Sequence, residues 1–189
     1  MFRPPLLVTS AAALTAVLAL TACDRFSAAG DTDRPIPIVA VADQSLPEPA
    51  VEELAPVCAA PDPAMIARLE EQVNAERVRL GRSPLKFKEN LAFAAQAHAC
   101  DMASMNRLTV AGSNGSSVVN RVRAVEYTAC SSAQLIGRAG DDYSQMSRWM
   151  GYKPDQEILV HNKFDDAGVG VVQSGGTYWW SLVLADHCG

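Results

Sequence analysis

Two stretches of helical periodicity joined by a short turn constrain the fold of this chain more than any other feature. In the first stretch, apolar residues share one helical face at Ile66, Leu69, Val73 and Leu80. Gly81 and Pro84 then supply the usual stop signals of a helix. The second stretch runs over 91–105, and its alanine-rich face allows a neighbouring element to pack closely. The sequence therefore predicts two consecutive helices with a tight turn between them.

The rest of the globular part predicts alternating helices and strands. Arg121 and Arg123 are expected on the outer face of a short third helix. The order predicts the α+β class, with helices packed over a small antiparallel sheet. The expected elements are a helix over 117–125, a strand over 127–136, a helix over 141–150, and two strands, 169–172 and 177–184, joined by a glycine turn.

Residues 1–22 have the pattern of a signal peptide. Arg3 supplies a positive charge, and the apolar run over 6–19 is too short to cross a bilayer comfortably. Leu20-Thr21-Ala22-Cys23 resembles a bacterial lipobox, in which the cysteine becomes the lipidated first residue. An ordinary secretory signal with an incidental cysteine is the alternative. We expect a lipid on Cys23 to hold the protein on a membrane of the bacterial cell envelope, facing the periplasm or the exterior.

Proline recurs among small and acidic residues throughout the segment 23–63. Because proline fixes φ and removes a hydrogen-bond donor, we expect no regular element there. The segment is expected to be an extended tether for a domain over 64–189; a leader without a mechanical role is the alternative. The net charge of −5 and the lack of a basic patch argue against a nucleic-acid partner.

Four further cysteines predict two disulfides in an exported chain. Sequence alone allows three pairings. We expect Cys58–Cys188, which would join the start of the domain to its end, and Cys100–Cys130, which would tie the second helix to the first strand. A structural zinc site is not expected, because no two of these cysteines have the close spacing that such sites use.

A series of short motifs runs through residues 64–184 in a fixed order. Together they resemble the bacterial branch of the CAP superfamily (cysteine-rich secretory proteins, antigen 5, pathogenesis-related 1). The resemblance implies an α–β–α sandwich and a cleft with histidine and glutamate ligands. The motifs are Val73-Asn74-Ala75-Glu76-Arg77, Ala95-Gln96-Ala97-His98-Ala99, Asn114-Gly115-Ser116-Ser117, Trp149-Met150, Phe164 with Gly168-Val169-Gly170-Val171, and Tyr178-Trp179-Trp180.

The chain departs from the implied cleft at each central position. Val110 stands where the resemblance implies a first histidine, Gln134 where it implies a glutamate, and Gln156 where it implies a second histidine. Valine offers no donor, and the neutral amide of glutamine neither titrates nor replaces an anionic or imidazole ligand. We therefore expect a degenerate cleft with no metal, no other cofactor and no catalytic residue.

Two further residues are possible neighbours of this cleft. Tyr152 stands about where eukaryotic relatives have an additional glutamate, and His161 is near the second missing histidine. His161 is expected on a polar surface loop, although a relocated site with nearby aspartates is an alternative; these are Asp155, Asp165 and Asp166. His98 is expected to be a core or rim histidine with one hydrogen bond.

The function expected from these observations is a non-catalytic binding or scaffolding role for a monomeric, membrane-tethered domain. Its partner would be an envelope protein or a lipid ligand. Two alternatives remain open at this point. A hydrolase or peptidase would need a relocated site around His161, and a lipid- or sterol-binding carrier would need a continuous apolar groove.

Overall fold

The computed structural model describes residues 39–41, 58–60 and 62–188, which all belong to one unit, Thr32–Gly189. The expected signal peptide and the expected lipidation site Cys23 lie outside the described residues. Within the described part, no helix combines the length and the apolar character that crossing a membrane requires.

The described helices agree with the sequence prediction and add one that it missed. They are seven to 17 residues long, and three of them begin at a side-chain cap, which is Asp62, Ser117 or Asp141. The unpredicted helix is the last. The helices are α1 (Pro63–Arg79), α2 (Glu89–Met105), α3 (Val118–Ala124), α4 (Asp142–Gly151) and α5 (Lys153–Leu159).

The described strands form one sheet with the order β1-β3-β5-β4-β2. Neighbouring strands are antiparallel except β2 and β4, so the expected antiparallel sheet carries one parallel edge strand. The three long strands were predicted from the sequence, and the two short ones were not. The strands are β1 (Val39–Val41), β2 (Lys86–Phe87), β3 (Ala129–Ala139), β4 (Asp166–Ser174) and β5 (Thr177–His187).

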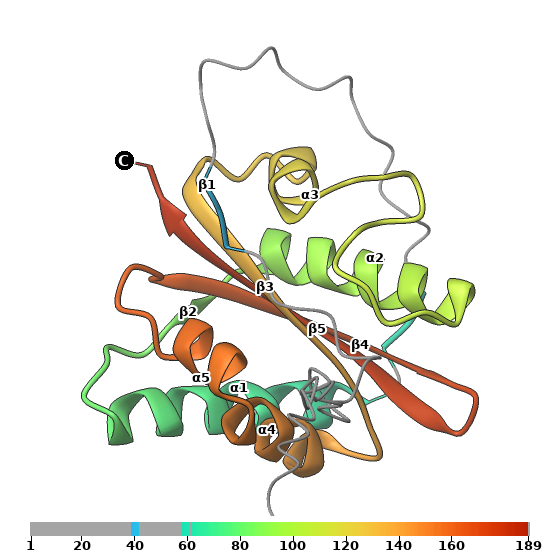
Figure 1. The fold of residues 1–189 in the computed structure, drawn as a ribbon, viewed down its shortest axis with the longest axis horizontal. Helices are drawn as coiled ribbons and strands as arrows, with labels where there is room; N and C mark the ends of the chain where they lie inside the picture. The colour runs from blue at the N-terminus through green and yellow to red at the C-terminus, as the bar shows by residue number, and fades with distance from the viewer. Residues whose placement is uncertain (1–38, 42–57, 61, 189) are drawn as a thin grey trace, which may run out of the picture. The chain divides into compact units, whose positions relative to one another are not determined.

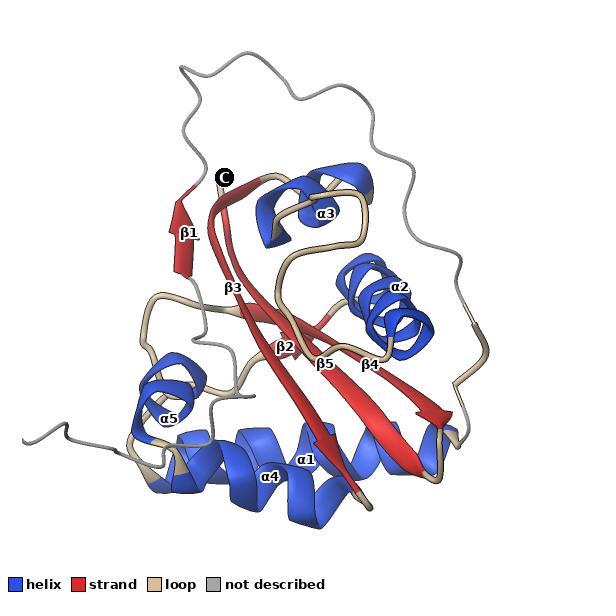
Figure 2. Ribbon diagram, turned by 45° about the vertical axis from the view of Figure 1, so that its right-hand side comes forward, coloured by secondary structure: helices blue, strands red, loops and turns tan. Residues whose placement is uncertain are grey.

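Helices cover both faces of the sheet, which confirms the expected α–β–α sandwich (Figures 1 and 2). Helices α1, α4 and α5 lie on one face, and α2 and α3 lie on the other. Trp179 and Trp180 illustrate the alternation along β5: both are buried, but they belong to apolar clusters on opposite faces. The core is therefore split into two layers by the sheet.

The α2 helix packs against β4 almost backbone to backbone. A Cβ atom built on Gly168 would lie 2.1 Å from the backbone nitrogen of Ala92, and one built on Gly170 would lie 2.2 Å from that of Gln96. Only glycine allows such an approach. The alanine-rich face of α2 and the glycines of β4 are thus two halves of one interface.

The expectation that segment 23–63 contains no regular element is wrong at Val39–Val41. These residues form β1 and pair with Ser131–Ala133 of β3 in antiparallel register. The stretch lies between prolines but contains none itself, and its valines favour an extended conformation. A three-residue strand at the edge of a sheet is too short to show a periodic pattern in the sequence.

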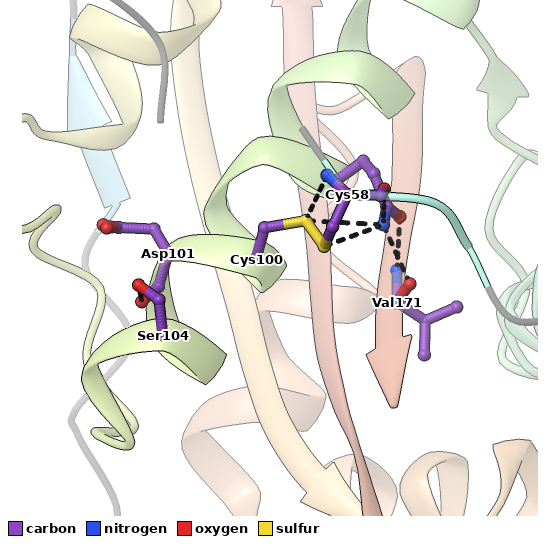
Figure 3. The surroundings of a disulfide bond; sticks show 6 residues. Cys58, Cys100, Asp101, Ser104 and Val171 are labelled. Carbon is purple, nitrogen blue, oxygen red and sulfur yellow. Dashed lines mark hydrogen bonds between the residues drawn. A yellow bond between two sulfur atoms is a disulfide. The ribbon is translucent and has the colours of Figure 1, made fainter. Parts of the chain in front are cut away.

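Two disulfides are present, as expected, but the expected pairing is wrong. The bonds are Cys58–Cys100 and Cys130–Cys188, with Cα atoms 5.8 and 5.0 Å apart. Cys130 and Cys188 meet because β3 and β5 are antiparallel, which places the start of one strand beside the end of the other. Cys58 instead lies beside α2, where Figure 3 shows its bond to Cys100.

Candidate functional site

Two of the three degenerate cleft positions meet at the side chain of Arg121. One terminal nitrogen of its guanidinium, Nη2, donates to the carbonyl of Val110 at 2.8 Å and to the Oε1 atom of Gln134. The amide nitrogen of Gln134 donates in turn to the hydroxyl of Ser181 at 2.8 Å. These contacts join the loop after α2, helix α3, and strands β3 and β5 into one buried polar cluster.

Arg121 is buried, which contradicts the expectation that it lies on the outer face of its helix. Only 4% of the residue is exposed. Its other terminal nitrogen donates to the carbonyl and the hydroxyl of Ser116, at 3.0 and 3.1 Å. Val118, three positions before Arg121, is also buried, and so is Val122, four positions after Val118. This spacing was the sequence signal that placed Arg121 on the inner face.

The arrangement makes the site unsuited to a divalent cation. A guanidinium stays protonated at any ordinary pH, so the site already contains a fixed positive charge. The Oε1 atom of Gln134, the ligand atom closest in kind to the implied glutamate, accepts a hydrogen bond from this charge. Among the described residues, no three His, Cys, Asp or Glu side chains are grouped closely enough to hold a metal ion.

His98 lies beside this cluster as a buried neutral imidazole. It is 1% exposed, and its Nε2 atom is 2.8 Å from the carbonyl oxygen of Thr109. Burial, and secondarily the charge of Arg121, lower the pKa of His98 to about 3. The expected core position with one hydrogen bond is confirmed. A neutral His98 with this bond donates its Nε2 proton and holds the loop that precedes Val110.

The side chain of Val110 contributes to a packed apolar layer. It lies against the cluster formed by Met102, Ile136 and Trp179. Leu108 and Val172 complete this layer. Val110 is therefore a partly buried member of this apolar layer.

Gln156 lies apart from the other two positions. It is half-buried on α5, whose neighbouring residues Ile158 and Leu159 join the core on the α1 face of the sheet. Its backbone N–H bonds to the carbonyl of Tyr152 at 3.0 Å, and Tyr152 itself forms the half-buried junction between α4 and α5. Val110 and Gln134 therefore both contact the guanidinium of Arg121, which is on α3, whereas Gln156 is on α5.

The candidates for a relocated site do not form one group either. His161 is exposed, and its Nδ1 atom accepts a hydrogen bond from the backbone N–H of Lys163 at 3.1 Å. Asp166, the first residue of β4, accepts a hydrogen bond from the hydroxyl of Tyr127 at 2.8 Å. Burial, followed by this contact, raises the pKa of Tyr127. Asp155 is buried on α5.

Two side chains of the motif Val73-Asn74-Ala75-Glu76-Arg77 stabilise the fold through hydrogen bonds to backbone atoms. The guanidinium of Arg77 is buried and donates to the carbonyls of Leu159 at 2.7 Å, His161 at 3.1 Å and Phe164 at 3.1 Å. Asn74 exchanges two hydrogen bonds with the backbone of Leu85. These two side chains fix the turn after α1 and the loop between α5 and β4.

Comparisons with known proteins agree with this architecture. The sequence model of the cysteine-rich secretory protein family matches residues 70–184. A comparison with curated protein sequences finds no relative.

Similar folds occur in solved structures of bacterial proteins. An extracellular protein with an SCP domain from Bacillus anthracis superposes with a TM-score of 0.61 at 16% identity, over 65% of this chain and 40% of its own. An outer surface protein from Borrelia burgdorferi superposes with a TM-score of 0.63 at 12% identity, over 67% of this chain and 95% of its own. A cysteine-rich secretory protein from Staphylococcus aureus superposes with a TM-score of 0.56 at 21% identity, over 67% of this chain and 39% of its own. The chain thus spans well under half the length of the first and third proteins, and these identities support the fold alone.

Proposed function

Because the chain belongs to the cysteine-rich secretory protein family, with a match over residues 70–184, we propose that it is a lipid-anchored envelope protein whose domain acts by binding rather than by catalysis. The observation that carries this proposal is the guanidinium of Arg121, hydrogen-bonded to both Val110 and Gln134. A permanent cation placed there opposes a divalent metal at the position where the family resemblance implies one.

General acid–base chemistry also lacks a suitable group in this cluster. Gln134 does not titrate, and the pKa of His98 is lowered to about 3. A base with so low a pKa is almost fully deprotonated at neutral pH but is too weak to accept a proton efficiently. The buried polar atoms are instead used to hold α3 and the loop after α2 against the sheet.

Export and anchoring are supported by features outside this cluster. The pattern at 1–22 and the lipobox-like Leu20-Thr21-Ala22-Cys23 favour a lipoprotein. Two disulfides favour an oxidising compartment. The similar structures include an extracellular protein and an outer surface protein of bacteria.

Zinc titration by calorimetry tests the proposal on the full chain. We expect no binding of micromolar or tighter affinity that depends on the cluster. The exposed imidazoles could bind zinc weakly, so a His161→Asn, His187→Asn double variant serves as the matched control. Micromolar binding that persists in the control and disappears in Gln134→Ala would contradict the proposal.

A further inference from the structure

A dense run of positive charge begins at the end of α1. Five of the 16 Lys and Arg residues of the chain fall within 77–88, and this stretch contains no Asp or Glu. The net charge of −5 conceals the run, so the lack of a basic patch inferred from composition does not hold for these 12 residues. The rest of the chain is correspondingly more acidic, which makes the end of α1 a distinct cationic region.

The turn after α1 presents this charge together with apolar side chains. Val78 and Leu80 are 58% and 38% exposed, which is unusual for large apolar side chains in the described part of the chain. Arg82 and Lys86 in the same stretch are also exposed. Apolar and cationic side chains are thus interspersed on one exposed turn. Such a combination is typical of surfaces that enter the interface of an anionic bilayer.

Backbone hydrogen bonds fix the shape of this turn. The N–H of Gly81 donates to the carbonyl of Val78 at 3.0 Å, and the N–H of Arg82 donates to the carbonyl of Arg77 at 2.8 Å. Gly81 has a φ of 72°, the left-handed conformation that often ends a helix, and a Cβ atom there would meet nothing within 4 Å. All residues of 78–84 are exposed. The turn is therefore a preformed and open surface.

The guanidinium of Arg77 joins a second cationic loop to this turn. It donates to the carbonyl of Ser83 at 2.9 Å and to that of His161 at 3.1 Å. Lys163, two residues after His161, is exposed. Because the acceptors of Arg77 are neutral carbonyls, these bonds do not cancel its charge, although Asp165 lies near enough to offset part of it. The two loops thus add their charge to one surface.

Carboxylates neutralise only part of the charge on this surface. Arg79 pairs with Glu76 at 2.7 Å, and the amine of Lys88 is 3.9 Å from the carboxylate of Asp166. Three other exposed cations form no salt bridge with another described residue. They are Arg82, Lys86 and Lys163. These three side chains can therefore bind an external anion without first breaking an ion pair within the described part of the chain.

We infer that this cationic surface docks on the anionic lipid headgroups of the membrane that holds the chain. Its members are Val78, Leu80, Arg82, Lys86 and Lys163. The cations bind lipid phosphates, and the two apolar side chains enter the boundary between headgroups and acyl chains. These apolar side chains favour a bilayer over a dissolved polyanion, which has no apolar interior.

The inference rests on the proposed lipid anchor and adds an orientation to it. Three cations give only weak and reversible binding by themselves, whereas a lipid chain and a cationic surface together give a stable attachment. The surface therefore orients an anchored domain, with the end of α1 toward the bilayer, and does not replace the anchor.

Fluorescence quenching by lipid tests the inference on the full chain. The chain is reconstituted into vesicles of phosphatidylcholine with brominated acyl chains, with or without about 30% phosphatidylglycerol. Val78→Trp is the reporter, because bromine quenches a tryptophan that reaches the acyl chains and the three native tryptophans are buried. We expect at least about threefold more quenching of this reporter with phosphatidylglycerol than without it. Tyr143→Trp, at an exposed position of α4, should show no such difference.

Charge variants of the reporter chain identify the cations that act. Each Lys or Arg near an anionic surface strengthens binding about fivefold, so we expect Arg82→Gln, Lys86→Gln to remove the extra quenching. The matched control is Arg107→Gln, Lys153→Gln, which removes the same charge from two other exposed positions. It should leave the extra quenching in place.

Equal quenching of Val78→Trp in the two kinds of vesicle would overturn the inference, and so would an equal loss in the charge variant and its control. Flotation of the vesicles reports on the anchor separately. A chain that floats with pure phosphatidylcholine but shows no extra quenching contradicts the surface alone, whereas a chain that does not float contradicts the lipid anchor. In the second case quenching is measured with excess vesicles, and the same dependence on phosphatidylglycerol is expected.

Discussion

Arg121 is the residue whose position most changes the reading of the cleft. The sequence indicates Val110 and Gln134 as candidate cleft positions through the flanking motifs. It does not indicate that a cation lies between them, since arginine on a short helix is ordinarily exposed. The only signal was the three-residue spacing of Arg121 from the buried Val118, which was outweighed by the charge of Arg121. The partner atoms include the backbone carbonyls of Val110 and Ser116 and the side-chain oxygens of Ser116 and Gln134, and they leave no pattern in the sequence.

Replacement of Arg121 should destabilise the fold measurably. Arg121→Met removes the donor to Val110, Ser116 and Gln134 and leaves their acceptor atoms buried. We expect a loss of about 3 kcal/mol in the free energy of unfolding, measured by chemical denaturation. Arg123→Met on the same helix is the matched control and should change this value by less than about 0.5 kcal/mol. Similar values for both variants would show that the cluster does not depend on the guanidinium.

His98 should make stability depend on pH in the acid range. The unfolded chain takes up a proton near the ordinary pKa of about 6.5, whereas the folded chain does so only near a pKa of about 3. The unfolded state therefore binds more protons between these values, and stability falls as the pH falls through this window. We expect His98 to account for about 2 kcal/mol of loss between pH 7 and pH 5.

The comparison that isolates this effect uses denaturation of three chains at both pH values. His98→Gln should lose less stability on acidification than the unmodified chain, by about the amount just given. His161→Gln changes an exposed imidazole and should follow the unmodified chain. An unchanged pH dependence in His98→Gln would mean that His98 is protonated in the fold at pH 5.

At the scale of helices and strands, predictability follows length and periodicity. Helices α1 and α2, each 17 residues long, were predicted from their apolar periodicity and stop signals. The two-residue β2 was not predicted, because it is too short to show a periodic pattern. The seven-residue α5 was not predicted either; α3 has the same length and was predicted, but α3 begins at the capping box of Ser117, whereas α5 has no side-chain cap. These elements depend on tertiary contacts, such as the hydrogen bonds from Arg77 to the carbonyls of Leu159 and Phe164.

The contact between α2 and β4 predicts a specific sensitivity to a single methyl group. In Gly170→Ala, the new Cβ would lie 2.2 Å from the backbone nitrogen of Gln96, so the helix must move away from the strand. We expect a loss of about 3 kcal/mol or more in the free energy of unfolding. Gly140→Ala is the control, because a Cβ there meets nothing within 4 Å. Equal stability of the two variants would contradict the close packing of α2.

At the scale of the whole molecule, the N-terminal segment is attached to the domain at two places. One attachment is β1 on the edge of β3, and the other is the disulfide from Cys58 to α2. The sequence predicted that the four cysteines form two disulfides, but it did not predict which cysteines pair. Pairing depends on which strand ends and helix ends come together, and that is a property of the assembled sheet.

The proposed lipid anchor is tested by changing one residue. Cys23→Ser removes the thiol that lipidation requires, so we expect the chain to move from the membrane fraction to the soluble fraction of the cell envelope. The folded domain should remain intact, because Cys23 takes no part in either disulfide. If the variant stays with the membrane as the unmodified chain does, the anchor is not a lipid on Cys23.

The central claim, that an arginine-centred cluster replaces a metal site, is tested most directly by unfolding the full chain with and without zinc. A site with micromolar affinity would add about 4 kcal/mol to the free energy of unfolding at 1 mM zinc. We predict no increase, because Arg121 already provides the positive charge at Val110 and Gln134. An increase of that size, abolished by Gln134→Ala, would contradict the claim.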